Sequence, residues 1–409
     1  MDTGAFVPNE ISGQADVPVV APVHGLGLEA ASPSVAAVAT LPVLHLINGQ
    51  HYAGAERVQD LLAQQLPAQG FRVGFACLKP ERFAELRRCQ DAPLFELGMR
   101  GRFDLRPAWR VAELVRREGY RLLHAHTPRA AMIGRLAAAM TGVPLVYHVH
   151  SPTSRDTTHR LRNWLNTTVE RWAIAGAARL ITVSASLAEH MRRSGVAAER
   201  LTVVPNGVPC VESVPDRLPP TDTWTLGTVA LFRPRKGTEV LLEAMALLRD
   251  QGLSLRLRAV GPFETSDYQQ RLESLVEHYG LHSHVEWTGY CRDVSAELAQ
   301  MDLFVLPSLF GEGLPMVVLE AMAAGVPVAA TRVEGVPEAI RDELDGVLAE
   351  PRDARSLADA IRRVIDGDVD WQALRAGALA RQRECFSDIS MAAGVARVYR
   401  ELLETTKGC

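Results

Sequence analysis

The sequence predicts an α/β protein made of two doubly wound domains that face each other across a cleft. Three observations point to this fold. Short apolar stretches, typical of buried strands in parallel sheets, alternate with amphipathic helical patterns. The alternation occurs twice, on either side of a proline-rich segment at residues 208–223. The 409 residues also exceed what a single hydrophobic core usually contains.

The first domain is expected over residues 41–207. Its apolar stretches predict strands at 42–47, 71–77, 92–97, 121–126, 144–150, 179–184 and 201–206. Helical patterns lie between them, at 55–66, 107–118, 129–141, 158–175 and 185–194. Residues 1–40 contain no Lys or Arg and no continuous apolar core, and a secretory signal needs both. We therefore expect a disordered N-terminal extension there.

The second domain is expected over residues 224–385, after a linker at 208–223. Its strands are predicted at 225–232, 253–261, 284–289, 302–308 and 326–331, and its helices at 237–250, 267–279, 293–300, 315–324 and 354–366. A last helix within 386–409 is expected to pack back on the first domain. Ligands of doubly wound sheets bind at the carboxyl ends of the strands, so the cleft between the domains is the expected site.

Composition and charge narrow the class of protein. The six cysteines are scattered without C-x-x-C spacing, which argues against a disulfide framework or a zinc site and favours a cytoplasmic location. No apolar run approaches the ~20 residues of a membrane span. Residues 41–210 hold 23 Lys and Arg against 13 Asp and Glu, whereas residues 211–409 hold 21 against 31. The asymmetry indicates either a basic surface that meets an anionic partner or a solvated face. Nucleic acid is not expected, because the arginines lack the aromatic pattern of known readers.

The stretch 302–331 carries the strongest local signal in the chain. It predicts a buried strand, a glycine-rich loop, an almost wholly apolar helix beginning at Pro315, and a second strand. The N-terminus of such a helix offers unpaired N–H groups to an anion. Glu312 lies in the loop and Glu320 inside the apolar helix, where a carboxylate is costly unless it is satisfied. Glu320 is thus expected to meet either a ligand hydroxyl or an internal partner such as a nearby arginine.

A series of short motifs runs along most of the chain. In order they are AGAERV (53–58), HAHTP (124–128), YHVHS (147–151), TVSASL (182–187), VVPNGV (203–208), FRPRKG (232–237), Glu312-x7-Glu320 and VEGVPEAI (333–340). In this order and spacing, residues 41 to 405 resemble the family-4 retaining glycosyltransferases, also called glycosyl transferases group 1. The resemblance implies the GT-B fold, in which two Rossmann-like domains enclose a cleft.

The resemblance also implies an enzyme, a hexosyltransferase. It would move a sugar from a nucleotide diphosphate sugar to a hydroxyl acceptor, with retention of configuration and without a metal or other cofactor. The leaving diphosphate then needs cations and N–H donors from the protein. Lys236 matches the family's lysine, but the arginine found five residues earlier in many relatives is replaced by Leu231. Arg233 is therefore the candidate for that role and Arg235 the fallback.

Other site residues follow from the same resemblance. Glu312 is expected to contact hydroxyls of the donor sugar, and Glu320 to accept hydrogen bonds from the nucleotide ribose. Gly54 lies in a strand-to-helix turn that would approach the diphosphate closely, which the missing Cβ permits. The loop and helix start should supply backbone donors to phosphates or sugar. These residues are Gly311, Gly313, Leu314 and Pro315.

Histidines at the ends of two predicted strands are further candidates. His150 matches the family's cleft histidine, which touches the donor sugar or the reaction centre. His148 alternates with it on one strand and shares its side of the sheet, so it is a second candidate. His124 and His126 are expected to be structural more often than ligand-binding.

Three polar residues in the remaining motifs are weaker candidates. Asn206 of VVPNGV and Glu338 of VEGVPEAI are kept as site residues on the resemblance alone. Glu334 stands where relatives often have glycine, and we expect it to border the donor sugar and affect which sugar fits. A GT-B epimerase or hydrolase, and a nucleotide-sugar-binding protein without catalysis, remain alternative functions.

The acceptor is expected on the first domain. Its arginines cluster, and aromatic residues such as Phe103, Trp109, Trp164 and Trp172 accompany two of the clusters. Basic residues beside amphipathic aromatic side chains suit an anionic membrane surface. The resemblance adds a glycan or lipid-linked acceptor. We therefore expect a cytoplasmic enzyme, peripheral at the inner face of the membrane, that extends a lipid-linked glycan for exopolysaccharide or lipopolysaccharide. Merely solvated arginines are the alternative.

Overall fold

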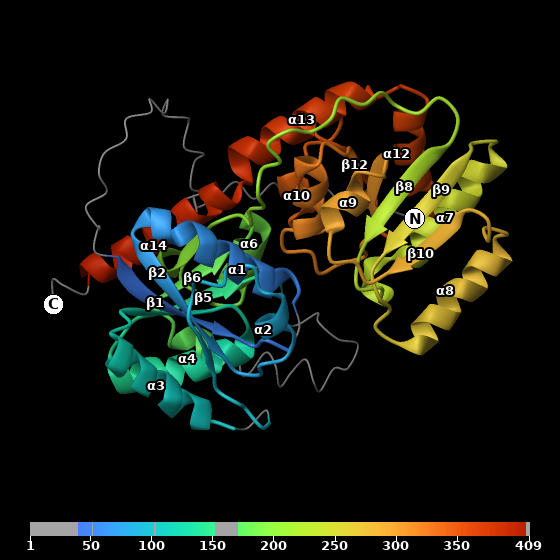
Figure 1. Ribbon diagram of the computed structural model, residues 1–409. Helices are drawn as coiled ribbons and strands as arrows, with labels where there is room; N and C mark the ends of the chain where they lie inside the picture. Colours follow the sequence, from blue (N-terminus) through green and yellow to red (C-terminus); the bar gives the residue numbers. More distant parts are fainter. Residues whose placement is uncertain (1–39, 51, 102–103, 152–170, 406–409) are drawn as a thin grey trace, which may run out of the picture.

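The protein forms two lobes, each built around one parallel β-sheet (Figure 1). The computed structural model describes residues 40–50, 52–101, 104–151 and 171–405. The extension expected at 1–40 lies outside these ranges except for its last residue. Of the helix expected at 158–175, only residues 171–175 are described, and they are helical. The predicted fold class, two doubly wound α/β domains, is confirmed.

The sheet of the first domain has seven strands in the order β3-β2-β1-β4-β5-β6-β7, and all neighbouring strands are parallel. The strands are β1 Leu41–Ile47, β2 Phe71–Cys77, β3 Leu94–Glu96, β4 Leu122–Ala125, β5 Leu145–Val149, β6 Arg179–Thr182 and β7 Leu201–Val203. The helical elements are α1 Gly54–Gln65, η1 Leu66–Gln69, α2 Arg82–Leu86, α3 Arg106–Glu118, α4 Pro128–Thr141, α6 Ala185–Arg193 and η3 Ala198–Arg200.

The sheet of the second domain has six strands in the order β10-β9-β8-β11-β12-β13, again all parallel. The strands are β8 Trp224–Val229, β9 Leu255–Val260, β10 Val285–Gly289, β11 Leu303–Leu306, β12 Val328–Thr331 and β13 Val347–Ala349. The helical elements are η4 Pro234–Lys236, α7 Thr238–Asp250, α8 Ser266–His278, α9 Val294–Leu298, α10 Met316–Ala323, α11 Val336–Ala339, α12 Ala354–Ile365 and α13 Trp371–Cys385.

In both sheets the chain reverses direction across the sheet at the centre. Strand β1 lies between β2 and β4, and β8 lies between β9 and β11. The chain leaves β1 on one face of the sheet and β4 on the other, and β8 and β11 do the same in the second sheet. This arrangement opens a crevice at the carboxyl ends of the strands. Helices cover both faces, so the strands are buried apolar runs, as in the four-residue β11, where every residue is buried.

The last helix, α14 Asp388–Thr405, connects the two lobes. It follows α13 of the second domain but packs against α1 and η1 of the first, as its red ribbon shows in Figure 1. Tyr399 on this helix is fully buried, and its ring meets the edge of Phe71 with centroids 5.1 Å apart. A Cβ added at Gly394 would lie 2.8 Å from Val204 Cγ1, so the helix approaches the first domain closely.

Candidate active site

Two loops of the second domain bring a lysine and a glutamate into direct contact. β8 and β11 are neighbouring parallel strands, so their carboxyl ends lie together. β8 leads into η4 and β11 leads into the glycine-rich loop. Nζ of Lys236 donates to Oε1 of Glu312 over 2.6 Å, and Oγ of Ser308 donates to the same oxygen over 2.7 Å. Sequence reasoning named the lysine and the glutamate but missed Ser308.

This pair is poorly solvated. The side chains of Lys236 and Glu312 are 15% and 7% exposed. Burial alone would raise the pKa of Glu312, but Lys236 and Arg235 together hold it below its usual value. Burial lowers the pKa of Lys236, and the attraction of Glu312 opposes that shift. The site therefore presents an ion pair whose charges act through less water than they would at the surface.

The two candidate arginines have different partners in the structure. Nη1 of Arg235 lies 3.4 Å from Oε1 of Glu312 and donates to the carbonyl oxygen of Gly311 over 3.2 Å. Arg233 instead pairs with Glu264, with 3.5 Å between the charged atoms. The fallback residue is thus the one beside Glu312. Spacing along the sequence could not reveal this, because η4 is a 3₁₀ turn in which successive side chains point about 120° apart.

The N–H groups at the start of the glycine-rich loop already bind an anion. Those of Gly311 and Glu312 donate to Oε2 of Glu334 over 2.9 and 3.2 Å. Glu334 has a φ of 32°, in the left-handed region that favours glycine. A carboxylate of the chain itself therefore occupies donors that the sequence assigned to phosphates or sugar, and it comes from the position where relatives often have glycine.

The rest of this loop forms the contact between the domains. A Cβ at Gly313 would lie only 2.0 Å from the carbonyl oxygen of His150, so the two backbones touch here. The carbonyl oxygen of Leu314 accepts a hydrogen bond from Nδ2 of Asn206 over 2.9 Å. Pro315 was expected to be the first helical residue, but its ψ of 116° makes it the N-cap, and α10 begins one residue later.

Glu320 meets an arginine of the other domain. It lies on α10 with 11% of its side chain exposed, and its Oε1 pairs with Arg57 on α1. The internal partner considered from the sequence is therefore present, although Arg57 itself was not named. Oε2 of Glu320 is buried and has no hydrogen-bond partner among the described residues. Gly54 is the first residue of α1, and a Cβ added there would find open space within 4 Å.

Glu338 joins the domains at a second point. Its two carboxylate oxygens accept hydrogen bonds from the backbone N–H groups of Ala185 and Ser186, over 2.6 and 2.8 Å. These N–H groups are unpaired at the start of α6, where the helix dipole also favours a negative charge. The structure gives Glu338, on α11, this contact between domains, which the sequence motif did not reveal.

The candidate histidines belong to a larger group. His148 and His150 lie on one side of the first sheet, as predicted, with ring centroids 4.5 Å apart. Nδ1 of His126 and Nε2 of His150 form a hydrogen bond of 3.0 Å. Loss of surrounding water lowers the pKa of His150 to about 4, so the ring is neutral at physiological pH. His45 on β1 completes the group and was missed by the sequence analysis.

Comparisons with known proteins place these motifs in a family. The model of "Glycosyltransferase Family 4" matches residues 52–212 and that of "Glycosyl transferases group 1" matches residues 212–382. The chain is 32% identical over 350 residues to a 2-deoxystreptamine glucosyltransferase of Streptomyces kanamyceticus, covering 77% of this chain and 88% of that protein. The chain belongs to glycosyltransferase family 4. The predicted family is thereby confirmed.

Other relatives of this family-4 chain align over shorter stretches. It is 32% identical over 199 residues to WcaL of Escherichia coli K12, a putative colanic acid biosynthesis glycosyltransferase, covering 47% of this chain and 48% of WcaL. The chain spans about half or less of the length of several curated relatives that it matches.

Solved structures of low sequence identity share the fold. Anabaena HepE, solved in complex with UDP, superimposes with a TM-score of 0.76 at 22% identity, over 88% of this chain and all of that one. The lipopolysaccharide outer core galactosyltransferase WaaB gives a TM-score of 0.68 at 16% identity, with the same coverage. These likenesses show that the fold is GT-B. No helix of the described residues is long and apolar enough to cross a membrane.

Proposed function

We propose that the protein is a retaining, metal-independent hexosyltransferase, which moves a sugar from a nucleotide diphosphate sugar to a hydroxyl acceptor. The observation that carries this proposal is the buried contact of Lys236 with Glu312 beside the start of α10. A leaving diphosphate gains negative charge in the transition state, and a preorganised ammonium in a poorly solvated site stabilises it. Arg235, next to the same carboxylate, is proposed as the second cation.

Donor binding is proposed to change the partners of the two glutamates. Glu312 would exchange part of its contact with Lys236 for hydroxyls of the donor sugar, which frees the ammonium to meet the diphosphate. Glu320 would keep Arg57 on Oε1 and accept the ribose on Oε2, the oxygen that has no partner among the described residues. Both exchanges keep each buried charge paired, which avoids the cost of an isolated charge.

Metal independence is proposed from the carboxylates of the cleft. A magnesium ion that bridges a diphosphate needs one or two protein carboxylates. Here Glu312 is bonded to Lys236, Glu320 to Arg57, and Glu334 to two backbone N–H groups. In this proposal Lys236 and Arg235 neutralise the diphosphate, which is the role that a magnesium ion would otherwise have.

The acceptor is proposed to be a lipid-linked glycan of exopolysaccharide or lipopolysaccharide synthesis. Similarity to WcaL and to a galactosyltransferase named for a diphosphoundecaprenol substrate supports this class. At the start of α3, Trp109 is 67% exposed and Leu105, the N-cap, is 45% exposed, beside the exposed Arg106 and Arg110. This face suits an anionic membrane, so we propose peripheral attachment at the inner face of the membrane. The clustered residues Phe103, Arg102 and those of 155–164 lie outside the described residues.

One incubation separates the proposed transfer from its alternatives. The purified protein is mixed with labelled nucleotide diphosphate sugars and a lipid-linked acceptor extract, and the products are separated. Labelled glycolipid indicates transfer, an isomerised or cleaved donor indicates an epimerase or hydrolase, and unchanged donor with a raised Tm indicates binding alone. The anomeric configuration of the product, determined by NMR, tests retention. Initial rates measured at once in EDTA or in Mg²⁺ should agree, and a rate that needs Mg²⁺ would refute metal independence.

Membrane attachment is tested separately. We expect the protein to sediment with anionic liposomes at low salt and to be released as the ionic strength rises. Trp109→Ser should weaken sedimentation. Trp287→Ser, in the second domain, is the control and should not weaken it, because the loss of a tryptophan elsewhere leaves the proposed membrane surface intact. Equal sedimentation with neutral and anionic vesicles would rule out the electrostatic surface and leave the transferase proposal intact.

A further inference from the structure

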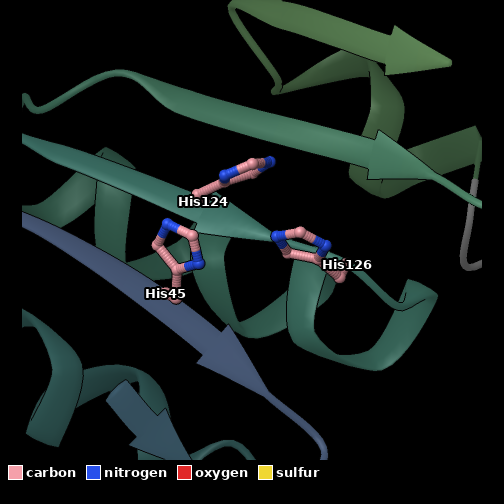
Figure 2. Close-up of side chains that lie close together, drawn as sticks. All are labelled: His45, His124 and His126. Carbon is pink, nitrogen blue, oxygen red and sulfur yellow. The ribbon is translucent and has the colours of Figure 1, made fainter. Parts of the chain in front are cut away.

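Three imidazole rings meet inside the first domain. His45 lies on β1 and His124 opposite it on β4, since the two residues are register partners in the parallel sheet. His126 follows two residues later and so lies on the same side. Their exposed fractions are 0%, 0% and 3%. One nitrogen from each ring can be chosen so that all three nitrogens lie within 4.8 Å of one another. Figure 2 shows one nitrogen of His45 directed toward His126.

One nitrogen of each ring is bonded and the other is not. The hydroxyl of Tyr399 lies 3.0 Å from Nε2 of His45 and 2.5 Å from Nδ1 of His124. Nδ1 of His126 is bonded to Nε2 of His150 over 3.0 Å. The opposite nitrogens, Nδ1 of His45 and Nε2 of both His124 and His126, are buried without a hydrogen-bond partner among the described residues. Buried polar atoms are nearly always satisfied, so three together call for an explanation.

We propose that these three nitrogens bind a transition-metal ion, with zinc as the occupant. Imidazole is a preferred ligand of zinc, and three histidines leave a fourth position for water. The absence of a carboxylate among the three rings disfavours magnesium and calcium, which prefer oxygen ligands. Zinc binds imidazole at about 2.0–2.1 Å, and three nitrogens at the full 4.8 Å separation would stand about 2.8 Å from a central ion. A shift of each ring by about 0.7 Å closes that difference.

The hydrogen bonds around the rings fit a metal-bound state. A histidine that binds metal through one nitrogen carries its proton on the other and donates it to a nearby acceptor. With the metal on the unbonded nitrogens, His45 and His124 both donate to the phenol oxygen of Tyr399, which has two lone pairs. His126 donates to Nε2 of His150. Every ring nitrogen of the three ligands then has a partner, whereas without the metal three of them have none among the described residues.

A competing set of histidines is less suitable. His126, His148 and His150 also have nitrogens within reach of a common ion. In that set, however, Nε2 of His150 is bonded to Nδ1 of His126, and His150 has no buried nitrogen that lacks a hydrogen-bond partner. The ion is therefore assigned to His45, His124 and His126. It would fasten β1 to β4 and, through Tyr399, fix α14 on the first domain, which is a structural role.

Metal content and stability test the assignment without measuring transfer. The untagged protein is purified, since a histidine tag would itself bind zinc, and its metal content is measured by mass spectrometry. We expect about one zinc per chain, lost after prolonged dialysis against dipicolinate. Returning zinc at about a hundred times its Kd should raise Tm by roughly 3–7 °C. Stripped protein that takes up no zinc and shows no rise in Tm would overturn the proposal.

Two variants locate the ion. His45→Gln should lose stoichiometric zinc and the rise in Tm, whereas the control His282→Gln, at an exposed histidine of the second domain, should keep both. Tyr399→Phe keeps all three ligands and removes only the acceptor of His45 and His124, so its affinity for zinc should fall about 10–100-fold. If His45→Gln fails to fold, Tyr399→Phe still tests the site. Cobalt should give the visible absorption bands of a tetrahedral site in the wild type. Zinc binding of unchanged affinity in both His45→Gln and Tyr399→Phe would show that the ion lies elsewhere.

Discussion

Replacing Lys236 by Ala should slow transfer by about 10²–10³-fold at saturating donor. The variant removes an ammonium that lies 2.6 Å from Oε1 of Glu312 and is only 15% exposed. What remains near the carboxylate is the hydroxyl of Ser308 and Arg235 at 3.4 Å. A fall of this size corresponds to about 2.7–4 kcal/mol of lost transition-state stabilisation. The free energy of unfolding should fall as well, since a buried carboxylate loses its main partner.

A double variant separates these two effects. In Lys236→Ala/Glu312→Gln the buried carboxylate is gone and Arg235 keeps its hydrogen bond to the carbonyl oxygen of Gly311, so part of the lost stability should return, while the rate should stay low. The assay is kcat from initial rates of labelled-sugar transfer, paired with urea unfolding of each variant. Lys79→Ala, at a partly exposed lysine of the first domain, is the matched control. If Lys236→Ala keeps kcat within about threefold of the wild type, with native circular dichroism, the ammonium does not stabilise the leaving group.

Three further predictions concern the cleft and α1. Glu320→Gln should mainly weaken binding of the free nucleotide, whereas Glu312→Gln should mainly depress kcat; equal effects of both on nucleotide affinity, measured by calorimetry, would contradict the separate roles. Gly313→Ala should lower kcat/KM at least tenfold, because its Cβ would lie 2.0 Å from the carbonyl oxygen of His150 and push the domains apart; Gly101→Ala, in open space, should be silent in the same assay. Burial raises the pKa of Glu56 to about 7, so the chain should lose stability as the pH rises from about 4.5 to about 7. Glu56→Gln should remove that part of the pH dependence of urea unfolding, and an unchanged curve would show that the carboxyl is solvated.

The regular elements were predictable because their signals are local. Parallel strands buried on both faces read as continuous apolar runs, and nearly all of them were placed within a few residues. β13 was missed because its three residues are too few to form a pattern. α13 was missed because its buried face includes Arg375 and Gln382, which break the apolar periodicity of that helix.

The contacts of the site depend on pairings that no local pattern contains. Lys236 and Glu312 were named from motifs, but their contact follows from β8 and β11 being neighbours in the sheet. The pairing of Arg57 with Glu320 joins residues 263 positions apart on different domains. His45 was missed for the same reason, since only the register of β1 with β4 places it beside His124. Sequence motifs thus identified the chemical groups, whereas the partner of each group had to come from the tertiary structure.

The crossing of α14 has a consequence for the biosynthesis of the protein. The sheet of the first domain is complete once the ribosome has passed Val203, yet Tyr399, which fills its core beside His45 and His124, is translated almost two hundred residues later. At about 5–20 residues per second, this domain remains without Tyr399 for roughly 10–40 s. During that interval its histidine cluster and the surface that α14 will cover stay accessible on the nascent chain. A stop codon placed just before α14 would therefore leave the sheet of the second domain complete, although the deleted residues follow that domain in the sequence. The first domain would lose the helix that covers its core.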